Sequence, residues 1–200
     1  MSKPKAKVAR ALGIALTPKA AKVIERRPGL PGQHGLGRRK SPSVYKLQLL
    51  EKQKLKALYN VSEAQLRKIY SDAHKGMENT GDNLLILLES RADSAVFRLG
   101  FARTIFAARQ YVAHGHFEVN GKRIYTPSIR LKVGDTITVR DKSKTHLQIT
   151  DALTHSQSIQ VPGYLELNKV KMEGKFVGRP SKDQIPVPIN PQLVVEYYSR

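Results

Sequence analysis

The chain has 200 residues, of which 35 are Lys or Arg and 16 are Asp or Glu, so its formal net charge is +19. This excess argues against an ordinary metabolic enzyme and favours a polyanionic partner, either a nucleic acid or an anionic membrane. Because the sequence has no cysteine, it excludes disulfides, thiolate zinc sites and cysteine nucleophiles. No apolar run approaches the ~20 residues that span a bilayer, and we expect neither a signal peptide nor a transit peptide.

The positive charge is concentrated towards the N-terminus. Residues 1–60 hold 15 basic and two acidic residues, which supply +13 of the +19. Within them, residues 1–42 include RRPGLPGQHGLGRRKSP, whose glycine and proline content disfavours a long helix or strand. We expect residues 1–42 to form an extended basic arm whose backbone amides reach polyanion oxygens. A flexible solvated tail is the alternative, although PGQHG (31–35) indicates a shaped loop.

Residues 43–90 predict a small helical domain. Ser43 is placed to cap a helix over 44–59, and SEAQ (62–65) is a capping box that starts a second helix. NTGDN (79–83) marks the turn into a third helix. Near the end of the chain, residues 185–199 are first punctuated by proline and then β-prone. We expect that run to dock on the helical domain, so residues 185–200 return to it.

Residues 91–184 predict a second domain in which a helix pair packs on a mostly antiparallel sheet. One helix covers 91–100, and a second covers 104–115 with Thr104 as its N-cap. Asn120-Gly121 lies between two β-type runs and is a strong hairpin signal. Further strand patterns follow at 128–141 and 161–180, with a short helix at 144–155 between them. The expected fold class is therefore α+β, with the extended basic arm preceding both domains.

Basic, amide and imidazole side chains gather in residues 91–123. Guanidinium groups bind phosphate, while amide and imidazole groups suit sugar and base edges, so this segment predicts a nucleic-acid surface. On the alternative interpretation, these charges are merely solvated helix faces. The sequence has no nucleophile motif and no glycine-rich phosphate loop, and His114 and His116 have no evident further ligands. We therefore expect no catalytic residue, no metal, no cofactor and no membrane partner.

Residues 88–135 resemble the RNA-binding domain named after the fourth protein of the small ribosomal subunit. PGQHG (31–35), LLEKQKLKALYNVSEAQLRKIY (49–70) and LVVEYYSR (193–200) are similar to the ribosomal protein S-four family in collinear order. The resemblance implies a primary binder of the 5′ domain of small-subunit ribosomal RNA that nucleates assembly and influences decoding accuracy. It further implies a place beside the fifth small-subunit protein, near the channel by which messenger RNA enters. The location it implies is the cytoplasmic ribosome, with an organellar ribosome as the alternative.

The resemblance also transfers the RNA-contacting positions of the family onto this chain, residue by residue. In this sequence they are Gly32, Gln33, His34, Tyr45, Gln53, Lys54, Arg91, Arg98, Arg109, Gln110, His114, His116 and Asn120. To these the local charge pattern adds Arg38, Arg39, Lys40, Arg103, Lys122 and Arg123.

The chain departs from the family pattern at several positions. The family usually has Arg directly after the Thr of the second helix, where this chain has Ile105, and we expect Arg103 to replace that contact. An Asp-Asn pair of the family is Asp93-Ser94 here. Some members bind zinc through an N-terminal cysteine cluster. This chain has no cysteine, so we expect RNA to order its arm.

Two other functions use the same RNA-binding domain. One is a targeting module of an RNA-modifying enzyme such as a pseudouridine synthase, and the other is a free-standing RNA binder of the heat-shock type. The short segment after the domain, broken by Pro and Gly, is expected to leave no room for a catalytic domain. The helical domain and the PGQHG loop argue against the free-standing binder.

Overall fold

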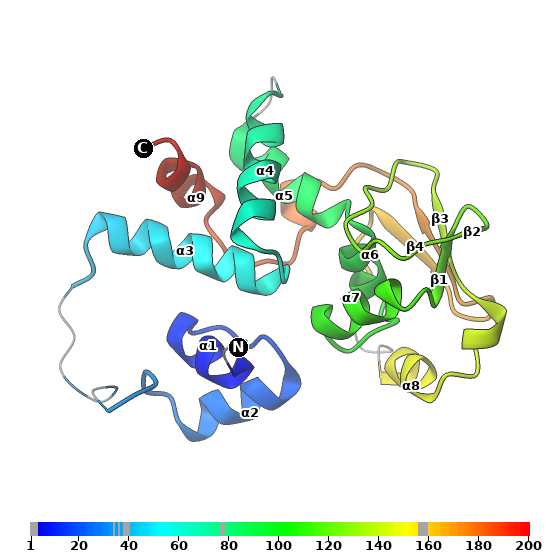
Figure 1. Ribbon diagram of the computed structural model, residues 1–200, viewed down its shortest axis with the longest axis horizontal. Helices are drawn as coiled ribbons and strands as arrows, with labels where there is room; N and C mark the ends of the chain where they lie inside the picture. Colours follow the sequence, from blue (N-terminus) through cyan, green and yellow to red (C-terminus); the bar gives the residue numbers. More distant parts are fainter. Residues whose placement is uncertain (1–3, 34, 36, 38–40, 77–78, 156–159) are drawn as a thin grey trace. The chain divides into compact units, whose positions relative to one another are not determined.

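The computed structural model describes residues 4–33, 35, 37, 41–76, 79–155 and 160–200. They form two compact units (Figure 1), here called the helical unit (Met1–Ser71 with Pro188–Arg200) and the sheet unit (Asp72–Val187). The sequence pattern instead divides the chain after residues 42, 90 and 184, and those domain bounds stay a prediction.

The helical unit begins with two helices, α1 (Lys5–Leu12) and α2 (Pro18–Arg26). The prediction of an extended arm over residues 1–42 is therefore wrong for residues 5–26. The glycine and proline content that suggested an extended chain lies in RRPGLPGQHGLGRRKSP (26–42), almost entirely after α2, and the glycine and proline of the preceding segment lie at helix ends. Gly13 follows α1 with φ 69°, and Pro18 occupies the first turn of α2, where Thr17 accepts a hydrogen bond from the Ala20 amide. Glycine adopts the left-handed conformation at a helix end without a Cβ penalty, and proline in the first turn lacks only an N–H that has no intrahelical acceptor.

The rest of the helical unit is built from α3 (Val44–Leu58), the start of α4 (Glu63–His74) and α9 (Pro191–Tyr198). The predicted capping box is confirmed, because the Gln65 amide donates to Ser62 Oγ (3.2 Å) and the Ser62 amide to Gln65 Oε1 (3.1 Å). Helix α9 packs against α3 (Figure 1), as the docking prediction expected. Its β-prone sequence nevertheless forms a helix, with Pro191 in the first turn and Val194 fully buried.

The sheet unit combines four described helices with a five-stranded antiparallel sheet. Its helices are α5 (Thr80–Glu89), α6 (Ala92–Arg98), α7 (Ile105–Ala113) and α8 (Leu147–His155). Its strands are β1 (Phe117–Val119), β2 (Lys122–Arg123), β3 (Thr136–Val139), β4 (Leu165–Asn168) and β5 (Glu173–Phe176), in the spatial order β2-β1-β3-β5-β4. The α+β class is thereby confirmed.

Local signals correctly located the helix pair and the first hairpin. Thr104 accepts a hydrogen bond from the Ala107 amide (3.2 Å) and so caps α7. Asn120 and Gly121 have φ angles of 50° and 74°, the left-handed conformation that a tight hairpin turn requires between β1 and β2. One hydrophobic core joins α6, α7 and α8 to the sheet, and the rings of Phe101 and Phe117 meet there at 5.6 Å between centroids.

Candidate nucleic-acid interface

Two arginines predicted to bind phosphate are tied to one buried carboxylate. Arg91 donates from Nε and Nη2 to the two oxygens of Asp93, at 2.9 and 2.6 Å. Arg91 is only 3% exposed, and Asp93 is fully buried. Arg109 Nη1 lies 3.5 Å from the same carboxylate, with 31% of its side chain exposed. A buried charge needs a close partner of opposite sign, so Arg91 acts inside the fold, while Arg109 still reaches the surface.

Arg98 is held in a similar way at the other end of α6. Its Nη2 lies 2.6 Å from Oε1 of Glu89, which is fully buried, and only 15% of the Arg98 side chain is exposed. The hydroxyl of Tyr164 donates to the other Glu89 oxygen at 2.9 Å. Burial, followed by the nearby Glu89 charge, raises the pKa of Tyr164 above its ordinary value. The tyrosine therefore stays protonated and keeps donating to Glu89.

A second group of predicted residues lies on the surface, where α7 ends and the β1–β2 hairpin turns. We call it the α7–hairpin surface, and it consists of the exposed residues Gln110, His114, Asn120, Lys122 and Arg123. Gly115 makes this arrangement possible, because its φ of 71° reverses the chain directly after α7. Arg123 donates back to the carbonyls of Gly115 (3.0 Å) and His114 (3.3 Å). Because those carbonyls are neutral, the positive charge of Arg123 is not cancelled.

Asn120 also has a structural role in the hairpin. Its Nδ2 donates to Asp135 at 2.8 Å, and its Oδ1 accepts from the Thr136 amide at 2.9 Å. These bonds connect the turn to the start of β3. The position of the neighbouring Lys122 is thus set by the sheet.

His116 lies beneath this surface, among residues that the sequence analysis did not identify. Its Nδ1 is 2.9 Å from Ser143 Oγ, and its ring centroid is 5.2 Å from that of His146 and 6.2 Å from that of His114. Burial, and next the charges of His146 and His114, lower the pKa of His116 below its ordinary value. Ser143 and His146 are about thirty residues away in sequence, and no local pattern of the sequence links them to His116.

Arg103 lies on the surface before α7, where it pairs with Asp151 at 2.8 Å. It was expected to replace a basic residue at position 105, but Ile105 is itself buried. The side chain at position 105 therefore contributes to the core. Asp151 partly neutralises Arg103, a pairing that the sequence analysis missed.

Three predicted contacts belong to α3 of the helical unit. Tyr45 is exposed and lies 5.9 Å from the ring of Tyr197. The interaction with the Tyr197 hydroxyl raises the pKa of Tyr45. Lys54 donates to Glu51 at 2.6 Å, and Gln53 is partly buried.

The PGQHG loop is anchored by an arginine that the sequence analysis missed. Arg10 of α1 donates to the carbonyls of Arg27, Gly29 and Leu30 at 2.9–3.1 Å. On its other side, the Leu30 carbonyl lies against Gly35, where a Cβ atom would clash with it. Contacts within the protein thus hold residues 27–30, while the expectation that RNA orders the arm stays a prediction.

Within the same loop, Gly32 and Gln33 are exposed. The predicted contacts His34, Arg38, Arg39 and Lys40 lie outside the described residues.

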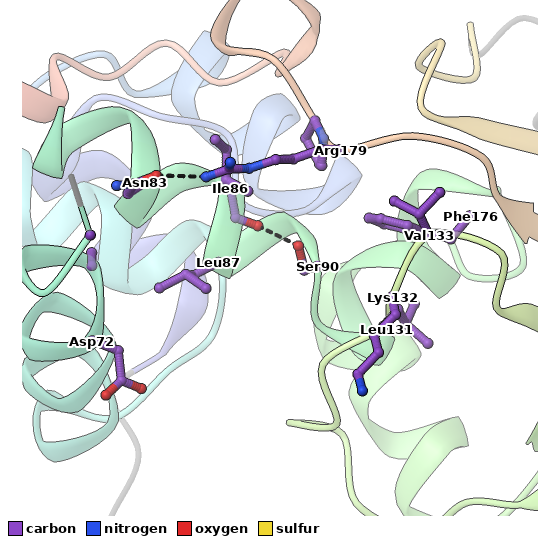
Figure 2. Close-up of a pocket in the computed structure, with 13 residues that line it drawn as sticks. Asp72, Asn83, Ile86, Leu87, Ser90, Leu131, Lys132, Val133, Phe176 and Arg179 are labelled. Atoms are coloured by element: carbon purple, nitrogen blue, oxygen red, sulfur yellow. Dashed lines mark hydrogen bonds between the residues drawn. The ribbon is translucent and has the colours of Figure 1, made fainter. Parts of the chain in front are cut away.

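A cavity of about 520 Å³ lies elsewhere in the sheet unit, between α5 and the loop at 131–133. Figure 2 shows Arg179 donating to Asn83 Oδ1 at its edge, over 2.8 Å. Ile86, Leu131 and Phe176 are among its apolar lining residues. The cavity contains none of the predicted RNA contacts and is therefore separate from the α7–hairpin surface.

Within the part of the chain that the structure describes, no three His, Asp or Glu side chains gather as a metal site would require. None of the described helices combines the length and apolar character that crossing a membrane demands.

Two protein-family models together match residues 1–137. Residues 1–89 match the family model of the ribosomal protein S4/S9 N-terminal domain, and residues 90–137 match that of the S4 domain. The second match contains α6, α7 and the β1–β2 hairpin, which carry the α7–hairpin surface.

Similar full-length proteins occur in several bacteria. The small ribosomal subunit protein uS4 of Micrococcus luteus is 49% identical, covering 96% of this chain and 93% of its own. The protein of that name from Geobacillus kaustophilus is 48% identical over 98% and 97%. The one from Chlorobium phaeovibrioides is 47% identical over 97% and 96%. At this identity and coverage, the chain belongs to the small ribosomal subunit protein uS4 family, as the resemblance of its motifs predicted.

Proposed function

We propose that the chain is a structural protein of the small ribosomal subunit that binds the 5′ domain of small-subunit ribosomal RNA. In this proposal it helps to nucleate subunit assembly. It also contributes to decoding accuracy beside the fifth small-subunit protein, near the channel by which messenger RNA enters. Membership of a ribosomal protein family confirms that the chain is not an enzyme. The observation that carries the RNA contact is the α7–hairpin surface.

The chemistry of that surface suits a folded RNA. Lys122 and Arg123 are exposed, and the hydrogen bonds of Arg123 to the neutral carbonyls of Gly115 and His114 leave its positive charge uncancelled. Gln110 of α7 and His114 at its end add exposed amide and imidazole groups, and the His114 carbonyl accepts from Arg123 at 3.3 Å. Folded RNA is recognised through phosphates, 2′-hydroxyls and shape, which is the combination that cations and neutral polar groups can bind together.

The buried arginines take a different part in this proposal. Arg91 and Arg98 form ion pairs with Asp93 and Glu89, so they support the helix pair instead of contacting phosphate. The cationic contacts of the sheet unit then shift to Lys122, Arg123 and, in part, Arg109. At 31% exposure Arg109 reaches both its carboxylate partner and solvent.

The test is a filter-binding titration of the full chain with a transcript of the 5′ domain, repeated at several salt concentrations. Lys122→Ala should weaken binding and lower the slope of log K against log salt by about one, because one phosphate contact is lost. Lys171→Ala is the matched control. It removes the same charge from the turn between β4 and β5, at the opposite edge of the sheet from β2.

The control should keep the slope of the wild-type protein. Equal losses in the two variants would place the contact elsewhere. A wild-type chain that fails to bind the transcript at ~50 mM salt, where phosphate contacts are strong, would contradict the proposed function. As an independent check, the chain should sediment with small subunits in near-stoichiometric amount.

A further inference from the structure

We infer that Tyr125 and Arg123 form a stacking site for one unpaired base of the bound RNA, an inference that rests on the proposed function. Tyr125 directly follows the β1–β2 hairpin and is 54% exposed. An aromatic ring at this exposure gains little from the core of the protein. It is instead placed to be covered by a ligand.

The Tyr125 ring already stacks with the Arg123 guanidinium group. The guanidinium carbon of Arg123 lies over the Tyr125 ring, 4.5 Å from its centroid. The same guanidinium donates from Nε to the Gly115 carbonyl (3.0 Å) and from Nη2 to the His114 carbonyl (3.3 Å). Two hydrogen bonds and one cation–π contact thus restrain a side chain that would otherwise be flexible. A restrained platform loses less conformational entropy when a ligand binds it.

Gly115 supplies the space for this platform. A Cβ atom at position 115 would stand 2.5 Å from Arg123 Nε and 2.8 Å from Tyr125 Cε1. The φ of 71° at this residue also disfavours any side chain. Gly115, Arg123 and Tyr125 lie within ten residues of one another in the sequence, and all three are therefore needed to build one flat, cationic surface.

The chemistry of the pair selects the ligand. Unpaired bases of RNA stack on aromatic rings and on guanidinium planes, and every base offers such a face. The uncancelled charge of Arg123 attracts the phosphate backbone that carries the base, and exposed Lys122 and His114 adjoin the same turn. A base in a loop, bulge or junction fits this site, whereas a base inside a continuous duplex is stacked already.

Two substitutions at position 125 separate stacking from simple burial. Tyr125→Phe keeps the aromatic face and should bind the 5′-domain transcript within about twofold of wild type. Tyr125→Leu keeps an apolar side chain without the π-face and should bind about 5- to 100-fold more weakly, the range for loss of one stacked base. Because neither change removes a charge, the salt slope should stay at the wild-type value. Circular dichroism should show that both variants are folded.

A second measurement uses the wild-type protein alone. Ultraviolet crosslinking of the protein–transcript complex, followed by mass spectrometry, should join Tyr125 to one nucleotide that is unpaired in the RNA. Equal affinities of Tyr125→Leu and wild type, or a crosslink map without Tyr125, would overturn the stacking site even though RNA binding stands. In assembled subunits, a crosslink from Tyr125 to an acidic protein segment would also overturn it. Failure of the wild-type chain to bind RNA would instead contradict the proposed function itself.

Discussion

In both the loop after α2 and the α6–α7 helix pair, arginine side chains hold neighbouring segments together. The positive charge of the arginine is retained in the loop and neutralised in the helix pair. In the loop, Arg10 binds three neutral carbonyls, so its positive charge remains. In the helix pair, Arg91 and Arg98 bind carboxylates that are themselves fully buried. A partly exposed guanidinium is stabilised well enough by carbonyls and solvent, whereas a buried one needs a counter-charge.

The difference shows that a count of arginines overstates the charge that faces a ligand. The helix pair looks strongly cationic in sequence, yet Arg91 and Arg98 are neutralised inside the fold. The N-terminal segment looks like a loose tail, yet residues 5–12 and 18–26 are helical and Arg10 holds the carbonyls of residues 27–30 without losing its charge. Four experiments, from the largest expected effect to the smallest, test this contrast.

The strongest test removes the carboxylate from the helix pair. Asp93→Ala leaves the buried guanidinium of Arg91 without its counter-charge, and we expect the free energy of unfolding to fall by about 3–5 kcal/mol. Urea unfolding followed by circular dichroism measures this loss. Asp151→Ala, which breaks the exposed pair with Arg103, should cost no more than about 1 kcal/mol. Similar losses in the two variants would remove the distinction between buried and exposed pairs.

The corresponding substitution for the loop after α2 is Arg10→Ala. The carbonyls of Arg27, Gly29 and Leu30 lose a charged donor, so the free energy of local opening should fall by about 1.5–3 kcal/mol. Hydrogen exchange of the Gly35 amide, which donates to the Gly32 carbonyl at 3.2 Å, reports this opening. The free energy of global unfolding should change less than the free energy of local opening that the exchange reports.

Two further variants define what Arg10 contributes. Arg10→Lys keeps the charge but has no planar fork to reach several carbonyls, so exchange should accelerate almost as much as in Arg10→Ala. Lys22→Ala removes a charge from neighbouring α2 and should leave the exchange rate unchanged. If Arg10→Lys behaved like the wild type, charge alone would explain the order of the loop.

A smaller effect should appear with pH in the sheet unit. Burial, followed by the charges of His146, His114, Arg123 and Arg140, lowers the pKa of His116. Below its ordinary value near 6.5, the unfolded chain takes up a proton that the folded chain resists. Stability should therefore fall as pH drops through 6.5 and level off below the folded pKa, and His116 should cost nothing above 6.5.

Urea midpoints at a series of pH values measure this dependence. Its slope should be well under the limit of about 1.4 kcal/mol per pH unit, because solvent screens a partly exposed imidazole. His116→Gln should flatten the curve. A curve that stays as steep in His116→Gln would assign the titration to another group.

The smallest effect is expected for Lys54, a partly buried cation of α3. Lys54 lies one turn from Glu51 and pairs with it at 2.6 Å. Lys54→Ala should lower the free energy of unfolding by only about 0.2–0.5 kcal/mol, as is usual for such helix pairs. Lys46→Ala on the same helix, where Lys46 is exposed, provides a matched measurement. A loss above about 1 kcal/mol at Lys54 would show that this pair behaves like the fully buried ones.

Much of the secondary structure was predictable because its causes are local. Thr104 caps α7, Ser62 and Gln65 form a capping box, and Asn120-Gly121 turns the first hairpin. Each of these signals involves residues at most four positions apart, whose backbone bonds depend little on the rest of the chain. The positive charge and the S-four motifs could likewise be identified from the sequence alone.

The tertiary structure decided how that charge is used. Arg10 reaches carbonyls up to 20 residues away, and Glu89 meets the hydroxyl of Tyr164 across 75 residues. Packing against α3 likewise made a helix of the β-prone C-terminal segment. No local pattern reveals whether an arginine will be buried beside a carboxylate or left facing solvent, since that depends on which distant segments pack around it. The sequence by itself therefore determined the family and the cationic character of this protein, and only the fold determined which cations stay exposed to solvent.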